Sequence, residues 1–218
     1  MLELPDGIQP RTVVGVLLNY RQAYEALAGA MSEAPYKAPP VAPVLYIKPA
    51  NTYAADGQAI TLPSDVAEVE VGACLGVVIG RRATRVARAS AMDYVSGYRV
   101  VADLSVPHTN YYRPALKQRC RDGFCPMSAI APAGRVHDPD RLDITVSIDG
   151  TTVLQANTGD LIRPVASLIE DVTAFMTLEA GDLLLVGVPA GSPHARAGQQ
   201  YEIAIPGVGT LTNRLLFP

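Results

Sequence analysis

The order of apolar and polar residues predicts a chain built mostly of strands. Runs rich in valine, isoleucine, leucine and threonine, bounded by glycine, proline, asparagine or aspartate, are typical of strands. These runs cover residues 12–18, 44–47, 66–80, 98–106, 143–148, 151–155, 182–188, 200–205 and 210–216. The Asp149-Gly150 pair, which separates two of the runs, is a strong signal for a hairpin turn.

Three segments are predicted to be helical. Residues 21–31 are rich in good helix formers and follow Asn19, a residue type that often caps a helix. A second helix is predicted to begin at Ser90, in a variant of the capping box, and to end near Gly97. A third spans residues 164–176, where apolar residues recur at the spacing of one helix face. The residues on that face, which we expect in the core, are Val165, Leu168, Ile169, Val172 and Phe175.

Many strands, few helices and no regular alternation of the two predict an α+β fold, rich in β structure, around a rolled mixed β-sheet. The 218 residues, 49% of them hydrophobic, are enough for one domain with a substantial core. We therefore expect residues 1–218 to form a single domain. Prolines between residues 35 and 49 exclude a helix there and predict an irregular arm that leads to Lys48.

Composition narrows the function classes. We see no leader at the N-terminus and no apolar stretch of the roughly 20 residues that a membrane span needs, so a soluble cytoplasmic protein is expected. The formal net charge of −3 argues against a nucleic-acid surface and favours a small anionic ligand. Cys74, Cys120 and Cys125 are irregularly spaced, and we expect reduced thiols rather than a disulfide or a zinc site.

One short segment, residues 111–126, concentrates positive charge in Arg113, Lys117, Arg119 and Arg121. These four residues occupy odd positions, so in an extended segment their side chains would point to one side and could bind carboxylates. A solvated edge strand, on which lysine and arginine discourage aggregation, accounts for the same spacing equally well. The prolines and the Asp-Gly turn around the cations favour a shaped loop.

Asp103 is the only acid in the apolar run of residues 98–106. Burial of a lone carboxylate without a partner is costly. We therefore expect Asp103 either to reach solvent or to bind a cation.

Several motifs, in the same order and along nearly the whole chain, resemble those of the fumarylacetoacetate hydrolase family. They are VVIG at 77–80, AMDYVSGY at 91–98, YYRP at 111–114, RDGF at 121–124, TAFMTLEAGD at 173–182 and GVP at 187–189. Within the family, LNYR at 18–21, YKAPP at 36–40 and QRCRDGFCP at 118–126 are most similar to the N-terminal repeat of the isomerase/decarboxylases of the homoprotocatechuate (4-hydroxyphenylacetate) meta-cleavage pathway.

The resemblance implies a β-roll fold and action on 2-hydroxyhepta-2,4-diene-1,7-dioate or 5-oxopent-3-ene-1,2,5-tricarboxylate. It also implies a divalent metal, Mg²⁺ or Mn²⁺, held by a Glu-x-Glu pair and a later Asp. In this sequence the two glutamate positions fall on Gly72 and Cys74, and the aspartate position falls on Asp103. Only one hard oxygen ligand remains, so we predict no tightly bound metal. Glu68 and Glu70 have the spacing of the pair but lie four residues early.

Other functional positions of the family also differ in this chain. The family lysine that precedes the RDG motif is Arg119 here. The histidine and glutamate of the family's lid helix fall on Ala23 and Ala26, and the two threonines of its Thr-Gly-Thr-Pro turn fall on Val186 and Val188.

Two hypotheses of different class remain. In the first, the domain is an enzyme that isomerises the dienol dioate without a metal, because proton transfer needs only an acid/base group and an oxyanion clamp. In the second, it is a non-catalytic subunit that packs against a metal-bearing paralogue. Either hypothesis implies a homodimer or a heterodimer, and a small dicarboxylate or tricarboxylate as substrate. A dimer is also expected because one small domain would leave apolar segments such as residues 183–188 partly uncovered. For the first, the catalytic candidates are Lys48 and Arg119, and the substrate-binding candidates are Arg121, Lys117 and Val188.

Overall fold

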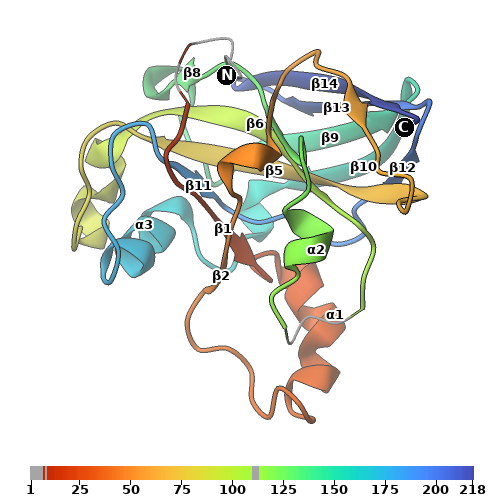
Figure 1. Ribbon diagram of the computed structural model, residues 1–218. Coiled ribbons are helices and arrows are strands. Elements are labelled where there is room, and N and C mark those ends of the chain that lie inside the picture. The colour runs from red at the N-terminus through yellow and green to blue at the C-terminus, as the bar shows by residue number, and fades with distance from the viewer. Residues whose placement is uncertain (1–6, 8, 110–112) are drawn as a thin grey trace.

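The computed structural model describes residues 7, 9–109 and 113–218, and consists mainly of two β-sheets with the helices outside them (Figure 1). The strands of the larger sheet are β1 (Val13–Leu17), β2 (Val44–Ile47), β3 (Tyr53–Ala55), β5 (Glu68–Ile79), β6 (Val95–Ser105), β7 (Cys125–Met127), β8 (Ala131–Pro132), β11 (Leu183–Leu185) and β12 (His194–Arg196). The strands of the smaller sheet are β4 (Ile60–Thr61), β9 (Asp143–Ile148), β10 (Thr151–Asn157), β13 (Gln200–Ile205) and β14 (Gly209–Leu216). The helices are α1 (Arg21–Met31), α2 (Leu116–Arg119) and α3 (Val165–Thr173), with 3₁₀ turns at Ala50–Thr52, Arg88–Tyr94, Ala133–Arg135 and Thr158–Asp160.

The larger sheet is mixed, as the sequence predicts. Its main order is β2-β1-β11-β5-β6-β7-β3, in which β1 and β11 are parallel while β11, β5 and β6 are antiparallel. The sheet is rolled. Strand β2 is at one end of the order, yet the side chain of Lys48, the residue after β2, reaches the carbonyl oxygen of Leu104 on β6. The predicted fold class is therefore confirmed.

The long antiparallel pair β5 and β6 forms the centre of the molecule. Both strands are buried over most of their length, which explains their continuous apolar sequences. Their register places Gly72 opposite Asp103 and Cys74 opposite Val101. The smaller sheet packs across β5 and β6 through β13 and β14, and the main core lies between the two sheets.

Two predicted helix starts are wrong, because side chains that could cap a helix bond elsewhere. Helix α1 has the predicted bounds, but Asn19 does not cap it, since the Asn19 amide bonds to the backbone of Arg163 and Val186. The segment predicted to begin at Ser90 is a 3₁₀ turn, Arg88–Tyr94, preceded by Ala87.

Helix α3 ends earlier than predicted, and this changes the position of Phe175. Val165, Leu168, Ile169 and Val172 are buried, but Phe175 is 70% exposed. The helix ends at Thr173, so Phe175 lies beyond the regular face that the spacing assumes.

Residues 182–188, which we expected the domain to leave partly uncovered, lie inside the larger sheet. Strand β11 in this segment is buried between β1 and β5. The expectation of an exposed apolar segment is therefore wrong, and a homodimer or heterodimer remains a prediction that rests on the family resemblance alone.

Cys74, Cys120 and Cys125 are free thiols, as expected. Among the helices of the described residues, none combines the length and apolar character of a membrane span.

Replacement of Asn19 tests the connection between β1, β11 and α3. We expect Asn19→Ala to lower the free energy of unfolding by about 2–4 kcal/mol, because it leaves buried backbone groups of Arg163 and Val186 without partners. Urea unfolding measures this loss. Asn51→Ala is the control, since the hydrogen bonds of Asn51 are exposed; an equal cost for both variants would contradict the proposed role of Asn19.

Candidate functional site

Side chains from β2, β6 and α2 meet in a buried ion cluster around Asp103. Asp103 Oδ1 lies 2.7 Å from Lys48 Nζ, and Asp103 Oδ2 lies 2.7 Å from Arg119 Nη1. The Tyr46 hydroxyl donates a hydrogen bond to Asp103 Oδ2. Tyr46, Lys48, Asp103 and Arg119 are hereafter called the Asp103 cluster. The expectation that a buried Asp103 would bind a cation is confirmed, and the cations belong to the chain itself.

Lys48 is fully buried and fully engaged. Besides Asp103, its ammonium contacts the carbonyl oxygens of Leu104, Arg119 and Phe124, each at 2.9 Å. An ammonium has three N–H donors, and these three carbonyl oxygens accept them all, so Asp103 Oδ1 is held by charge and not by a hydrogen bond. In this conformation Lys48 therefore holds the roll of the sheet together and has no donor left for a substrate.

Arg119 connects the Asp103 cluster to the surface. Its guanidinium lies 4.7 Å from the centre of the Tyr46 ring, and its side chain is 11% exposed. An arginine has five N–H donors in a planar fork, and Asp103 engages only Nη1. Of the residues predicted to be catalytic, Arg119 is thus the one that keeps donors near solvent.

The charges in the Asp103 cluster determine its protonation states. Burial alone would raise the pKa of the Asp103 carboxyl, but Lys48 and Arg119 outweigh it and lower the pKa to about 2. Burial, and then the charge of Asp103, raises the pKa of Tyr46 well above its ordinary value. At neutral pH the carboxylate is therefore charged and the phenol stays protonated as its donor.

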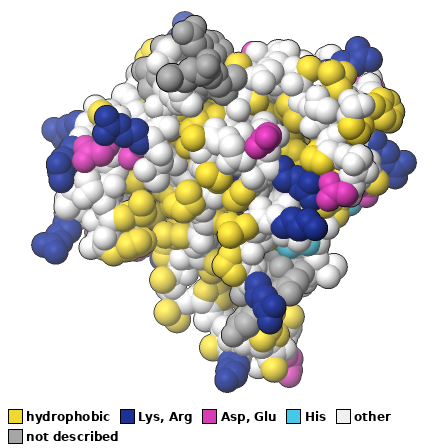
Figure 2. Space-filling model, in the orientation of Figure 1, with side chains coloured by type: hydrophobic (Ala, Val, Ile, Leu, Met, Phe, Trp, Pro, Cys, Tyr) yellow, Lys and Arg dark blue, Asp and Glu magenta, His cyan; other side chains and the backbone are white. Residues whose placement is uncertain are grey.

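The predicted row of cations in an extended segment is wrong, because residues 116–119 form helix α2. Neighbouring helix residues differ in direction by about 100°, so alternate residues point apart. Arg119 is directed inward, and Lys117 is exposed. Arg121 forms a two-pronged ion pair with Asp65, with both N–O distances 2.9 Å. On the face drawn in Figure 2, Lys and Arg side chains lie at the edges, right of centre and in the lower part, several of them beside Asp or Glu, with apolar side chains between these groups.

The family's three metal-ligand positions do come together, but their residues do not fit a divalent metal. Gly72 and Asp103 are cross-strand partners, yet a Cβ atom at Gly72 would lie 2.6 Å from the Asp103 carbonyl oxygen and 2.8 Å from Val188 Cγ1. Cys74 is fully buried, and burial raises the pKa of its thiol, which stays neutral and is a poor ligand for hard cations. Asp103 Oδ2 accepts hydrogen bonds from Tyr46 and Arg119, whereas Asp103 Oδ1 forms an ion pair with Lys48 Nζ without a hydrogen bond. Both oxygens therefore lie beside a cation of the chain itself, which would repel a metal ion.

Other acids do not replace the missing ligands. Glu68 binds His194 and Arg196 on neighbouring β12, with a distance of 2.8 Å to His194 Nδ1. In the part of the chain that the structure describes, no group of three or more His, Cys, Asp or Glu residues is arranged to hold a metal ion. The absence of a tightly bound metal remains a prediction for the protein in solution.

Sequence reasoning missed Tyr46, which lies in an ordinary strand pattern two residues before Lys48. The useful signal is Gly15, the residue paired with Tyr46 across β1 and β2. A Cβ atom at Gly15 would lie 2.2 Å from Tyr46 Cζ, so the ring reaches Asp103 only because residue 15 has no side chain.

Removal of the Asp103 charge tests the electrostatics of the cluster. Asp103→Asn leaves Lys48 and Arg119 without a carboxylate, and we expect a loss of about 3–5 kcal/mol of unfolding free energy at pH 7. Because the pKa of Asp103 is lower in the folded protein, its stabilisation is present above about pH 4 and is lost as the pH falls towards 2. Urea unfolding at neutral and acidic pH should therefore show a smaller loss on acidification for the variant than for the parent.

The control for this change is Asp65→Asn, which removes the exposed carboxylate that pairs with Arg121. Exposed pairs contribute little, so this variant should unfold nearly as the parent does. If the two variants lost the same amount of stability, the Asp103 cluster would be a surface-like ion pair rather than a buried one.

Restoration of the family's glutamates tests the fit of the metal position. We expect Gly72→Glu with Cys74→Glu to lower the melting temperature and not to bind Mn²⁺, because the new side chain meets backbone at Asp103 and a buried charge lacks a partner. Thermal melts with and without millimolar Mn²⁺, and elemental analysis of both proteins, measure this. Cys74→Ala is the matched control for loss of the thiol. If Mn²⁺ raised the melting temperature of the double variant by several degrees, the core around residue 72 could make room for the glutamate and the metal.

Comparison with known proteins places the chain in a family. Residues 12–216 match the model of the fumarylacetoacetate (FAA) hydrolase C-terminal family. The chain is 38% identical to the 4-hydroxyphenylacetate degradation bifunctional isomerase/decarboxylase of Salmonella dublin, over 93% of this chain and 46% of that protein. It is also 31% identical to the mitochondrial oxaloacetate decarboxylase of Dictyostelium discoideum, over 92% of this chain and 91% of that protein.

Solved structures agree with this relationship. The 5-carboxymethyl-2-hydroxymuconate delta-isomerase from Mycobacterium smegmatis matches with a TM-score of 0.81 and 28% identity, over 97% of this chain and 80% of that one. The chain spans about half the length of the bifunctional relatives, 46% in each of three. Since the family model covers nearly the whole chain and the fold agrees, this protein belongs to the fumarylacetoacetate hydrolase family.

Proposed function

We propose that this chain is one component of an isomerase/decarboxylase of the 4-hydroxyphenylacetate (homoprotocatechuate) meta-cleavage pathway, and that it is the component without the metal. The names of its relatives support the pathway, because three bifunctional isomerase/decarboxylases are 35–38% identical to it. A 2-hydroxyhepta-2,4-diene-1,7-dioate isomerase from Mycobacterium marinum has a similar structure, with a TM-score of 0.78 and 29% identity. The substrates would be that dienoate and 5-oxopent-3-ene-1,2,5-tricarboxylate.

The observation that carries the proposal is the engagement of Asp103 by Lys48, Arg119 and Tyr46. A carboxylate whose two oxygens hold an ammonium, a guanidinium and a phenol has little capacity left for a cation. No reaction step is therefore assigned to Asp103 in this chain. The same engagement favours the second hypothesis, a subunit that works with a metal-bearing paralogue, since Lys48 is no longer available as a substrate clamp.

One observation keeps the first hypothesis, a metal-free isomerase, as the second candidate. Arg119 is partly exposed and retains N–H donors beside the Tyr46 ring. A planar guanidinium can bind a carboxylate through two parallel hydrogen bonds, which suits a dioate substrate. On this reading Arg119 holds the substrate, while Lys48 and Asp103 hold Arg119 in place.

The two candidates make opposite predictions for the isolated chain. We expect the purified chain with Mn²⁺ to be inactive on both substrates, and an equimolar mixture with a metal-bearing paralogue to be active. A practical partner is the half of the Salmonella dublin enzyme that this chain does not match, expressed separately. Loss of dienol absorbance measures isomerisation, and release of CO₂ measures decarboxylation. The partner alone must be assayed beside the mixture, so that a gain can be credited to this chain.

Turnover by the isolated chain would overturn the proposal, and turnover that persists when a chelator replaces Mn²⁺ would favour the metal-free isomerase. In that case Arg119→Ala should weaken binding of a stable dioate analogue, measured by calorimetry, by about 1.5–3 kcal/mol, the range for hydrogen bonds to charged groups. Arg121→Ala is the matched control, because Arg121 pairs with Asp65 at the surface. Equal affinity of the parent and both variants would remove Arg119 from the binding site.

A further inference from the structure

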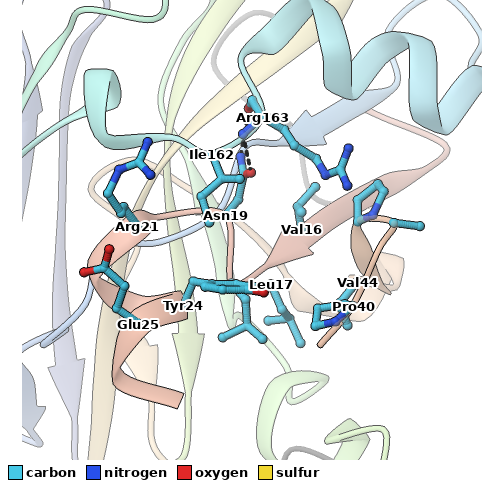
Figure 3. Close-up of a pocket in the computed structure, with 13 residues that line it drawn as sticks. Val16, Leu17, Asn19, Arg21, Tyr24, Glu25, Pro40, Val44, Ile162 and Arg163 are labelled. Carbon is cyan, nitrogen blue, oxygen red and sulfur yellow. Dashed lines mark hydrogen bonds between the residues drawn. The ribbon is translucent and has the colours of Figure 1, made fainter. Parts of the chain in front are cut away.

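A cavity of about 340 Å³ lies outside the Asp103 cluster, where β1 ends and α1 begins (Figure 3). Its remaining walls are the proline arm at residues 40–44 and the loop residues 162–163, which precede α3. This volume is within the range of small-molecule sites, which are about 300–1,000 Å³. No residue of the Asp103 cluster lines this cavity.

The cavity is also on the opposite side of α1 from the family's lid positions. Helix residues are spaced by about 100°, so residues 23 and 26 share one face and residues 21, 24 and 25 share the other. Ala23 packs against the main core, whereas Arg21, Tyr24 and Glu25 line the cavity. The cavity is therefore not the space that a lid over Asp103 would close.

The backbone at the cavity is held in a strained conformation. Leu18 has a φ of 58°, in the left-handed region that branched residues rarely adopt. Asn19 holds this conformation in place, because its side chain bonds to both the N–H and the carbonyl oxygen of Arg163 and to the carbonyl oxygen of Val186. A strained backbone conformation persists only where the surrounding structure holds it in place, and such conformations are often found at ligand sites.

Arg163 is the polar group that the walls position best. Its Nη1 donates to Asp171 at 2.9 Å and its Nη2 donates to the Val41 carbonyl oxygen at 2.7 Å. These bonds hold the guanidinium at the arm and use two of its five N–H donors. Figure 3 shows the guanidinium extending past Val16, on the side of Asn19 away from Arg21 and Glu25. A carboxylate at this end of the cavity could use the remaining donors.

The rest of the cavity indicates the shape of the ligand. Its floor is apolar, with Val16, Leu17 and Val44, and its proline walls are stiff. Glu25 and Arg21 lie on the other side of Asn19 from the Arg163 guanidinium in Figure 3. Within the described residues neither Arg21 nor Glu25 has a hydrogen-bond or ion-pair partner. Their opposite charges offset one another, so this end of the cavity does not attract a second carboxylate.

We propose that this cavity binds a small organic acid with one carboxylate, held by Arg163, and an apolar chain that lies over Val16, Leu17 and Val44. The site is independent of the pathway and of the partner proposed above. A monocarboxylate is favoured over a dioate because Arg163 keeps N–H donors at one end of the cavity, while the charges of Arg21 and Glu25 offset one another at the other and the floor between them is apolar.

Calorimetric titration of the purified chain with hexanoate tests the proposal, with hexanamide and adipate as comparison probes. We expect hexanoate to bind with a dissociation constant of about 1 mM or lower, within the range for a ligand of this size. Hexanamide, which has no charge, and adipate, which has two, should bind at least about tenfold more weakly.

Variants locate the binding. Ala42 lines the cavity, so Ala42→Phe should fill it and abolish hexanoate binding. Ala38→Phe is the matched control, because Ala38 is an exposed residue of the same arm that does not line the cavity. Arg163→Gln should weaken binding by about tenfold or more, while Arg82→Gln, at an exposed arginine outside the cavity, should leave it unchanged. Thermal melts of all variants verify that each is folded.

Four results would overturn the proposal. They are no heat of binding at millimolar hexanoate, equal affinity for hexanamide, equal affinity of the Ala42→Phe and Ala38→Phe variants, and adipate binding more tightly than hexanoate. Loss of hexanoate binding in a further variant, Arg119→Gln, would instead place the acid at the Asp103 cluster. Because the assay measures binding to the isolated chain, its outcome is separate from whether a metal-bearing partner restores turnover.

Discussion

The neutralisation of one buried carboxylate, Asp103, is the constraint on which the site and much of the fold depend. A carboxylate in the middle of β6 would be very costly without partners, because its charge loses hydration. The partners come from far along the chain, since Lys48 follows β2 and Arg119 ends α2. The sheet must curve to bring β2 over β6. The ion cluster can therefore form only in the curved sheet, and the cluster in turn stabilises that curvature.

Desolvation also explains why the cluster is built from so many groups. The attraction between two buried charges rarely offsets their loss of hydration unless further hydrogen bonds satisfy their remaining donors and acceptors. Here Tyr46 adds a hydrogen bond to Asp103, and three backbone carbonyl oxygens complete the surroundings of Lys48. Leu104 lies near the end of β6, Arg119 ends α2 and Phe124 precedes β7, so the ammonium joins three separate segments of the chain.

The sequence predicts local structure well where a single period governs a segment, as at residues 21–31 and 200–205, whose helix and strand have the expected bounds. The sequence predicts local structure poorly where pairing with a distant segment determines it. The strands β3, β4, β7, β8 and β12 have two or three residues each, too few for a period, and exist because a longer neighbour pairs with them. The same limit applies to the site. Asp103 could be recognised as a residue that needs a cation. Tyr46 could not be recognised from its own segment, because its signal, Gly15, lies on another strand and has meaning only once the pairing of β1 and β2 is known.

The close approach of Val188 and the β6 backbone to Gly72 has a consequence for substitution at this position. A glutamate at position 72 would need open space, and in this chain the Val188 side chain and the carbonyl group of Asp103 occupy that space. A glycine whose neighbours have closed around it cannot be exchanged alone without displacing them. A carboxylate at position 72 therefore requires several coordinated changes in the core at once, whereas exposed residues of the surface and of the α1 cavity can be exchanged one at a time.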